Sequence, residues 1–116
     1  MEDGVKLLID ILFDPTARED EISDAAMDLG GYKDIRALNA LMLFASTSQE
    51  DYLIDDAAES IAEICIGLGV FDENSFRKLV PFAQRIVFNL VMARKPELID
   101  KQFQQEFSKK LNLEDG

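Results

Sequence analysis

The sequence predicts an all-α protein built from antiparallel helix pairs stacked as a short α-solenoid, and three observations support this. Apolar residues recur at helical spacing along the chain, and no run alternates apolar and polar residues for long enough to form a strand. The phrase Ile-x-Asp-Ala-Ala occurs at residues 22–26 and again at 54–58. The length of 116 residues suits one hydrophobic core. We therefore expect a single helical domain over 1–116, with about six helices.

The first two helices are separated by a proline. An apolar stripe predicts the first helix over residues 5–12. Pro15 ends this helix, because a proline forces the preceding residue out of the α region. Thr16 and Glu19 have the spacing of a capping box, which predicts the start of the second helix. Gly30 and the glycine after it predict its end.

The third and fourth helices repeat this arrangement. Asp34 is expected to N-cap the third helix. Residues 35–45 are apolar on most sides of a helix, which indicates a helix that lies between neighbours. Ser48 and Asp51 again have capping-box spacing and predict a fourth helix that runs to about Ile66.

The C-terminal helices are marked by two prolines. A fifth helical region is expected after Asp72, and it must bend or restart at Pro81, which lacks an N–H and clashes one turn back. Pro96 suits the first turn of a sixth helix that continues through Phe103 and Phe107. The short loops favour antiparallel packing of successive helices.

The repeated phrase lies on the apolar face of each of two helices. In the second copy the apolar positions follow the spacing i, i+3, i+4, i+7 and i+11, which is one face of a helix. The paired alanines let another helix approach closely. Each copy follows an apolar helix, so residues 1–66 are expected to hold two repeated helix pairs, followed by C-terminal helices over 73–116. Such pairs bury their faces only by stacking.

The strings YKDIRALNALMLFA and YLIDDAAESIAEI resemble a HEAT-type repeat. Asp34 opens the first helix of that pattern, and the paired alanines lie in the second. The arginine that this family usually has before the alanines is absent, because Asp55 and Asp56 stand there. The resemblance covers 1–66 better than 73–116 and implies a HEAT-like α-solenoid. The alternative is an unrelated helical bundle with a chance duplication.

The charge of the chain is strongly negative and unevenly distributed. The net charge is −11. Residues 1–72 carry 17 acids and 4 bases, a net −13, whereas residues 73–116 carry 6 acids and 8 bases, a net +2. Such a surface is repelled by nucleic acid phosphates and by anionic membranes. We expect no direct contact with nucleic acid or membrane, and a basic protein as the partner.

The acids gather on the outer arcs of the two repeated helices. A helical projection places Ser60 and the acids of the fourth helix opposite its apolar stripe, and the acids of the second helix on the matching arc. Tyr32 and Tyr52 flank these helices, and tyrosine is enriched in binding hot spots. The alternative is a solvated face that only keeps the protein soluble. The expected partner-binding residues are Asp24, Asp28, Tyr32, Tyr52, Asp55, Asp56, Glu59 and Glu63.

The sequence contains no motif for catalysis, cofactor binding or metal binding. It has no histidine, the commonest acid–base group and metal ligand. Cys65 lies on an apolar stripe, which indicates a buried structural thiol. The string DPTAREDEISDA lacks the glycine and the ligand spacing of a calcium loop. We expect no enzyme activity and no catalytic, cofactor or metal site.

The remaining predictions concern the residues of the core and the location of the protein in the cell. The core is expected to include Phe71, Phe76, Phe82, Phe88, Met27, Met42 and Met92. The acidic start MEDGVKLL does not resemble a signal peptide, and Pro81 interrupts the longest apolar stretch. One cysteine cannot form an internal disulfide, so a reducing cytoplasm is the expected location.

The opening MEDGVKLLIDILFDPTAREDEISDAAMDLGGY, with the HEAT-like pair after it, resembles the small helical immunity proteins of bacterial toxin systems, including contact-dependent growth inhibition. The resemblance implies a protein that binds an incoming toxin domain, often a basic ribonuclease, and blocks its active site. A carboxylate array competes for the lysines and arginines that a nuclease presents to RNA. The alternatives are a non-enzymatic HEAT-like adaptor or scaffold, and a regulatory subunit of an enzyme. The oligomeric state stays open.

Overall fold

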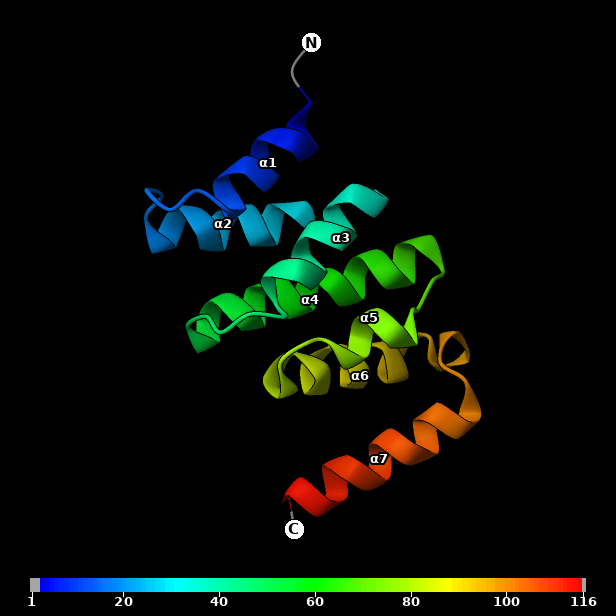
Figure 1. Ribbon diagram of the computed structural model, residues 1–116. Coiled ribbons are helices and arrows are strands. Elements are labelled where there is room, and N and C mark those ends of the chain that lie inside the picture. Colours follow the sequence, from blue (N-terminus) through cyan, green and yellow to red (C-terminus); the bar gives the residue numbers. More distant parts are fainter. Residues whose placement is uncertain (1–2, 116) are drawn as a thin grey trace.

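The computed structural model describes residues 3–115, and these residues form helices joined by short loops, with no strand among them (Figure 1). The all-α prediction is confirmed. Seven α-helices are present within the described residues, one more than expected. They are α1 (Gly4–Leu12), α2 (Glu19–Leu29), α3 (Ile35–Phe44), α4 (Asp51–Leu68), α5 (Glu73–Arg77), α6 (Pro81–Arg94) and α7 (Lys101–Asp115), with a 3-10 helix η1 (Pro96–Leu98) before α7.

Short acidic side chains begin several of the helices. Asp34 N-caps α3 as expected, and its carboxylate accepts a hydrogen bond from the Arg36 N–H at 2.8 Å. Asp72 caps α5 in the same way. Pro81 stands at the first position of α6, so the predicted restart is confirmed. Gly69 ends α4 with a φ of 71°, a left-handed conformation that favours glycine.

Three predicted helix starts are wrong. Thr16 instead donates its hydroxyl to the Asp14 carboxylate at 2.7 Å, which forms a turn, and α2 begins only at Glu19. The Ser48 capping box does not form either, because α4 begins at Asp51. Pro96 begins η1 and not the last α-helix.

The helices follow one another along the length of the molecule in chain order, with α1 and α2 at one end and α7 at the other (Figure 1). Helix α4 is central and packs against α2, α3 and α6. The Ser60 hydroxyl on α4 is buried and donates to the Ala26 carbonyl at 2.6 Å, a bond across 34 positions. Ser60 therefore lies between the helices, and its predicted place on the outer arc is wrong. A Cβ at Gly30 would lie 2.5 Å from the Ser60 Oγ, so glycine permits this close approach.

The short helix α5 is tied to α6 by Gln84, whose buried side-chain amide donates to the Phe76 and Arg77 carbonyls, each at 3.2 Å. Helix α6 packs on α4 on the side away from α2. Its buried side chains include the adjacent pair Val87 and Phe88.

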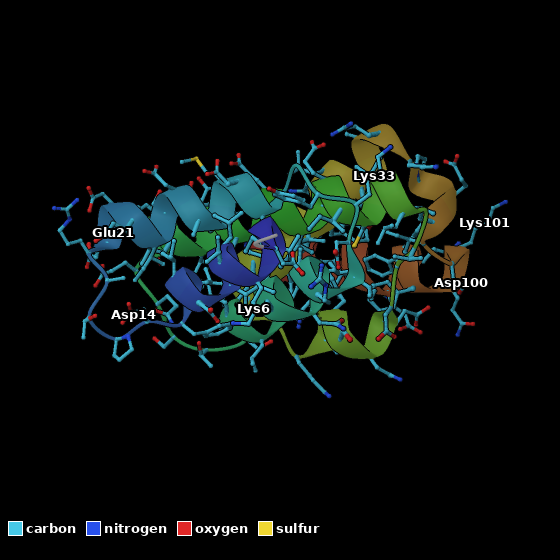
Figure 2. The ribbon with its side chains drawn as sticks, turned by 90° about the horizontal axis from the view of Figure 1, so that it is seen from above. Lys6, Asp14, Glu21, Lys33, Asp100 and Lys101 are labelled. Carbon is cyan, nitrogen blue, oxygen red and sulfur yellow. The ribbon has the colours of Figure 1, made fainter. Side chains whose placement is uncertain are left out.

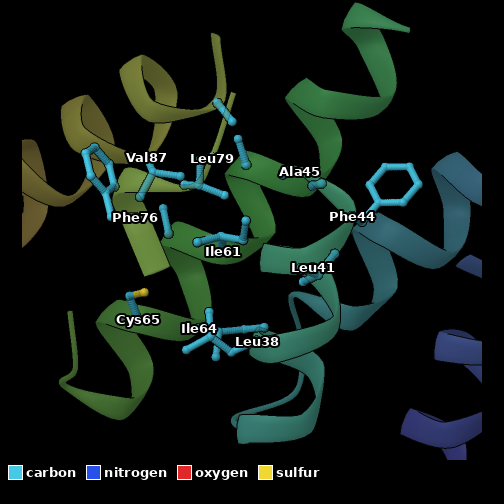
Figure 3. Close-up of a cluster of buried hydrophobic side chains, with 14 of the residues drawn as sticks. Leu38, Leu41, Phe44, Ala45, Ile61, Ile64, Cys65, Phe76, Leu79 and Val87 are labelled. Atoms are coloured by element: carbon cyan, nitrogen blue, oxygen red, sulfur yellow. The ribbon is translucent and has the colours of Figure 1, made fainter. Parts of the chain in front are cut away.

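Buried side chains from all seven α-helices form one continuous hydrophobic cluster, part of which Figure 3 shows between α3, α4, α5 and α6. Phe103 and Phe107 attach α7 to it, since their ring centroids lie 5.5 and 5.0 Å from that of Phe76. The prediction of a core position is wrong for two residues, because Phe82 is 43% exposed and Met27 is 49% exposed. Phe76 and Phe88 are buried as expected, and Phe71, Met42 and Met92 are partly buried.

The buried position of Cys65 gives a direct test of this packing. Its side chain is 4% exposed and points into the cluster (Figure 3). Burial raises the pKa of the Cys65 thiol to about 11, so little thiolate forms at neutral pH. We expect a thiol reagent to react slowly with the native protein and rapidly with the urea-unfolded chain. Equal rates in the two states would place Cys65 on the surface.

Candidate protein-binding face

The outer sides of α2 and α4 lie next to each other and carry a group of carboxylates that we call the acidic face. It consists of Asp24, Asp28, Asp55, Asp56, Glu59 and Glu63. The Ser23 hydroxyl of α2 donates to the Asp56 carboxylate of α4 at 2.5 Å, and the Tyr52 hydroxyl donates to Glu19. These bonds hold the two helices in register. Figure 2 shows oxygen-tipped side chains along the outer edge of α2, between Glu21 at its start and Lys33 beyond its end.

The six carboxylates differ in their internal partners. Asp56 accepts the Ser23 hydrogen bond. Glu63 forms an ion pair with Arg94, which α6 supplies across the helix interface. Sequence reasoning missed Arg94, because it lies outside the repeated helices. The other four have no ion pair within the described part of the chain, namely Asp24, Asp28, Asp55 and Glu59.

Two side chains of this region have perturbed titration. Partial burial raises the pKa of Glu59, and the nearby carboxylates of Asp55 and Asp56 raise it further. The hydrogen bond to Glu19 raises the pKa of Tyr52 to about 12, so the phenol stays protonated and held in place. The carboxylates of Asp55, Asp56 and Glu59 therefore repel one another at the centre of the acidic face.

The two tyrosines lie at opposite ends of the acidic face, and both are exposed as expected. Tyr52 stands in the first turn of α4, beside the start of α2. Tyr32 follows the end of α2 and lies against the start of α1, where a Cβ at Gly4 would be 2.8 Å from its hydroxyl. The acidic face thus has an aromatic side chain at each end.

Met27 is an exposed apolar residue that the sequence interpretation wrongly placed in the core. It lies on α2 between Asp24 and Asp28, and its carbonyl oxygen is 3.5 Å from the Ser60 hydroxyl of α4. At 100° per residue Met27 projects 60° from Asp24 on the outer arc, so a helical projection of the sequence already indicates that it is exposed. Methionine is enriched in protein interfaces and adapts to irregular surfaces.

The repulsion around Glu59 predicts a pH-dependent gain in stability for Glu59→Gln. Because the folded-state pKa of Glu59 is raised, its ionisation destabilises the fold at pH 7, and this effect is lost as the pH falls through the folded-state pKa. We expect the variant to be more stable than the wild type by about 0.2–0.5 kcal/mol for each like-charge pair removed at pH 7. At about pH 3.5 the two proteins should have equal free energies of unfolding, because Glu59 is then mostly protonated. Urea unfolding at both pH values measures this.

The matched control is Glu97→Gln, which removes an exposed carboxylate from η1, outside the acidic face. Its effect on the free energy of unfolding should be small and should show no comparable gain at pH 7. Destabilisation by Glu59→Gln at pH 7 would mean that Glu59 makes a favourable contact in the folded state.

Among the described residues, no group of three or more His, Cys, Asp or Glu side chains is placed to hold a metal ion. No helix in residues 3–115 combines the length and the apolar character needed to cross a membrane. Comparison with protein-family models, with curated proteins and with solved structures gave no match.

Proposed function

We propose that this chain is a bacterial immunity protein that binds a cognate basic toxin domain, a ribonuclease, through the acidic face. The observation that carries the proposal is the set of four carboxylates on adjacent helices that lack an ion pair in the described structure: Asp24, Asp28, Asp55 and Glu59. An array of one sign that the fold does not neutralise is complementary to a surface of the opposite sign.

The stacking of the helices supports a HEAT-like solenoid as the scaffold. Helix α2 packs on α4 and α4 on α6, while α1 and α3 pack on α2 and α4 from the other layer. We propose that α2, α4 and α6 form the partner-facing layer, as the second helices of HEAT-like pairs do. The acidic face occupies the first two helices of that layer, and Arg94 limits it on the third.

The proposed mechanism is competition for the cationic groups of the toxin. A ribonuclease must hold RNA phosphates with lysine and arginine side chains. Carboxylates spaced along α2 and α4 pair with those groups and occlude the surface that binds RNA. Opposite charge also accelerates the encounter of the two proteins, and Met27 and the two tyrosines supply apolar contact area. The chain acts without catalysis, and we place it in the cytoplasm, where it meets the toxin.

The test is protection of cells from a toxin encoded beside the gene. The C-terminal domain of the protein encoded immediately upstream is expressed in bacteria with and without this chain. Growth arrest that the chain relieves, together with inhibition of RNA cleavage by the purified pair, is the expected result. Without such a toxin in the neighbourhood, or without protection, the immunity proposal fails. Binding to a non-toxic protein would instead support an adaptor or a regulatory subunit.

A further inference from the structure

A shallow hollow lies at the α1 end of the molecule, beside the acidic face. Its volume is about 550 Å³, and it is largely open to solvent. Leu7 and Tyr32 are 44% and 41% exposed, so two large side chains of the lining meet solvent. The lining consists of Gly4, Leu7, Leu8, Ile11, Asp28 and Tyr32. One of them, Asp28, also belongs to the acidic face.

The lining combines three kinds of group: aliphatic side chains, an aromatic ring and a carboxylate. Leu7, Leu8 and Ile11 form an aliphatic wall. Tyr32 contributes an exposed aromatic ring, and Asp28 contributes an exposed carboxylate with no hydrogen bond or ion pair in the described structure. A side chain with an apolar stem and a cationic end can contact all three groups at once.

We infer that this hollow receives an arginine side chain of the partner protein. The guanidinium pairs with the Asp28 carboxylate and stacks on the Tyr32 ring, while the methylenes of the stem lie along Leu7 and Ile11. Arginine fits better than lysine, because a planar guanidinium can stack and form a bidentate pair at once. The inference rests on the proposed function, in which the partner is a basic protein, and names the residue that this partner inserts.

The chain leaves the hollow open for an external cation. Lys6 on α1 is paired with Asp10, with the Nζ 2.9 Å from a carboxylate oxygen. The stem of Lys33 instead lies over α4, where a Cβ at Gly67 would be 3.2 Å from it. Neither of these lysines therefore pairs with the Asp28 carboxylate.

The absence of a side chain at Gly4 sets the position of the aromatic wall. A Cβ there would lie 2.8 Å from the Tyr32 hydroxyl and 3.6 Å from the ring carbon that bears it. Glycine therefore lets the phenol rest against the first turn of α1. Gly4→Ala is expected to displace the ring and change the shape of the hollow without changing its charge.

The test uses the whole chain and a small probe, N-acetyl-arginine amide, followed by NMR of the tyrosine ring protons. The chain has two tyrosines, so each resonance can be assigned with a Tyr52→Phe variant. We expect the Tyr32 resonances to shift saturably while those of Tyr52, at the other end of the acidic face, stay nearly constant. The neutral analogue N-acetyl-citrulline amide should cause no saturable shift, and N-acetyl-lysine amide should bind more weakly.

Two variants of α2 separate this subsite from general attraction. Asp28→Asn should weaken binding of the arginine probe about tenfold, the effect of losing one charge-assisted hydrogen bond. Asp24→Asn removes the same charge one turn earlier and should weaken binding much less. Gly4→Ala should also weaken it, with an unchanged circular dichroism spectrum as the check on folding.

Two results would overturn the inference. Parallel shifts of both tyrosines, with equal effects of Asp24→Asn and Asp28→Asn, would mean that arginine samples diffuse negative charge. Equal binding of the lysine probe would remove the assignment to arginine. Because the experiment contains no partner protein, either result leaves the immunity proposal to be decided by the protection test alone.

Discussion

Replacement of Phe76 by alanine is expected to lower the free energy of unfolding by about 3–5 kcal/mol. Phe76 is 1% exposed, and its ring centroid lies 5.0–5.5 Å from those of Phe71, Phe103 and Phe107. The substitution removes the ring that joins α5 to α7 and leaves a cavity that the surrounding helices can fill only in part. Urea unfolding followed by circular dichroism measures the change.

Phe82→Ala is the matched control for this prediction. It removes the same side chain from the first turn of α6, where Phe82 is 43% exposed. Its cost should stay within about 0.5–1 kcal/mol, because more than two fifths of its surface already contacts water. Similar losses in the two variants would mean that Phe76 is not a central packing residue and that α7 is held by other contacts.

Reversal of charge at the centre of the acidic face is expected to weaken partner binding by about 2–5 kcal/mol. The variant combines Asp55→Lys with Glu59→Lys, two carboxylates on adjacent turns of α4. Neither has an ion pair in the described structure, and their mutual repulsion helps to raise the pKa of Glu59. The fold should therefore remain intact. Association and dissociation rates with the proposed toxin partner, together with cell protection, measure the effect.

The control must carry the same net charge. Glu97→Lys with Glu106→Lys reverses two acids of the C-terminal region, where Glu106 makes a long contact of 3.8 Å with Arg77 and accepts a hydrogen bond from the Gln102 amide at 3.5 Å. The control should bind almost as the wild type does, because both reversed acids lie outside the acidic face. The wild-type association rate should fall with added salt, because exposed charges are screened beyond about 8–10 Å at physiological ionic strength. Full binding and protection by the Asp55 and Glu59 variant would show that the acidic face is only solvated surface.

Much of the fold was predictable because helical periodicity and helix-breaking residues are local signals. The stop at Gly30, the cap at Asp34 and the restart at Pro81 all agree with the structure. The two predicted capping boxes failed because a serine or threonine followed three residues later by an acid also suits a turn, as Thr16 shows by bonding to Asp14.

The placement of individual side chains was less predictable than the helices. Met27 and Phe82 were assigned to the core by residue type, although burial depends on which neighbours cover a helix face. Ser60 was assigned to the surface by helical projection, and the approach of α2 at Gly30 makes it interior. The hollow around Asp28 depends on the crossing of α1 and α2, which no pattern within one helix reveals.

The side-chain bonds that link α4 to α2 and to α6 join residues 31–34 positions apart, such as Ser23 with Asp56 and Glu63 with Arg94. Each of these bonds closes a loop of little more than thirty residues, so it can form before the rest of the chain has been made. Helices α2 and α4 can therefore assemble on the ribosome while α7 is still unsynthesised, an order that limited proteolysis of stalled chains would report. The surface proposed to capture a toxin is then ready before the residues that finish the core have been translated.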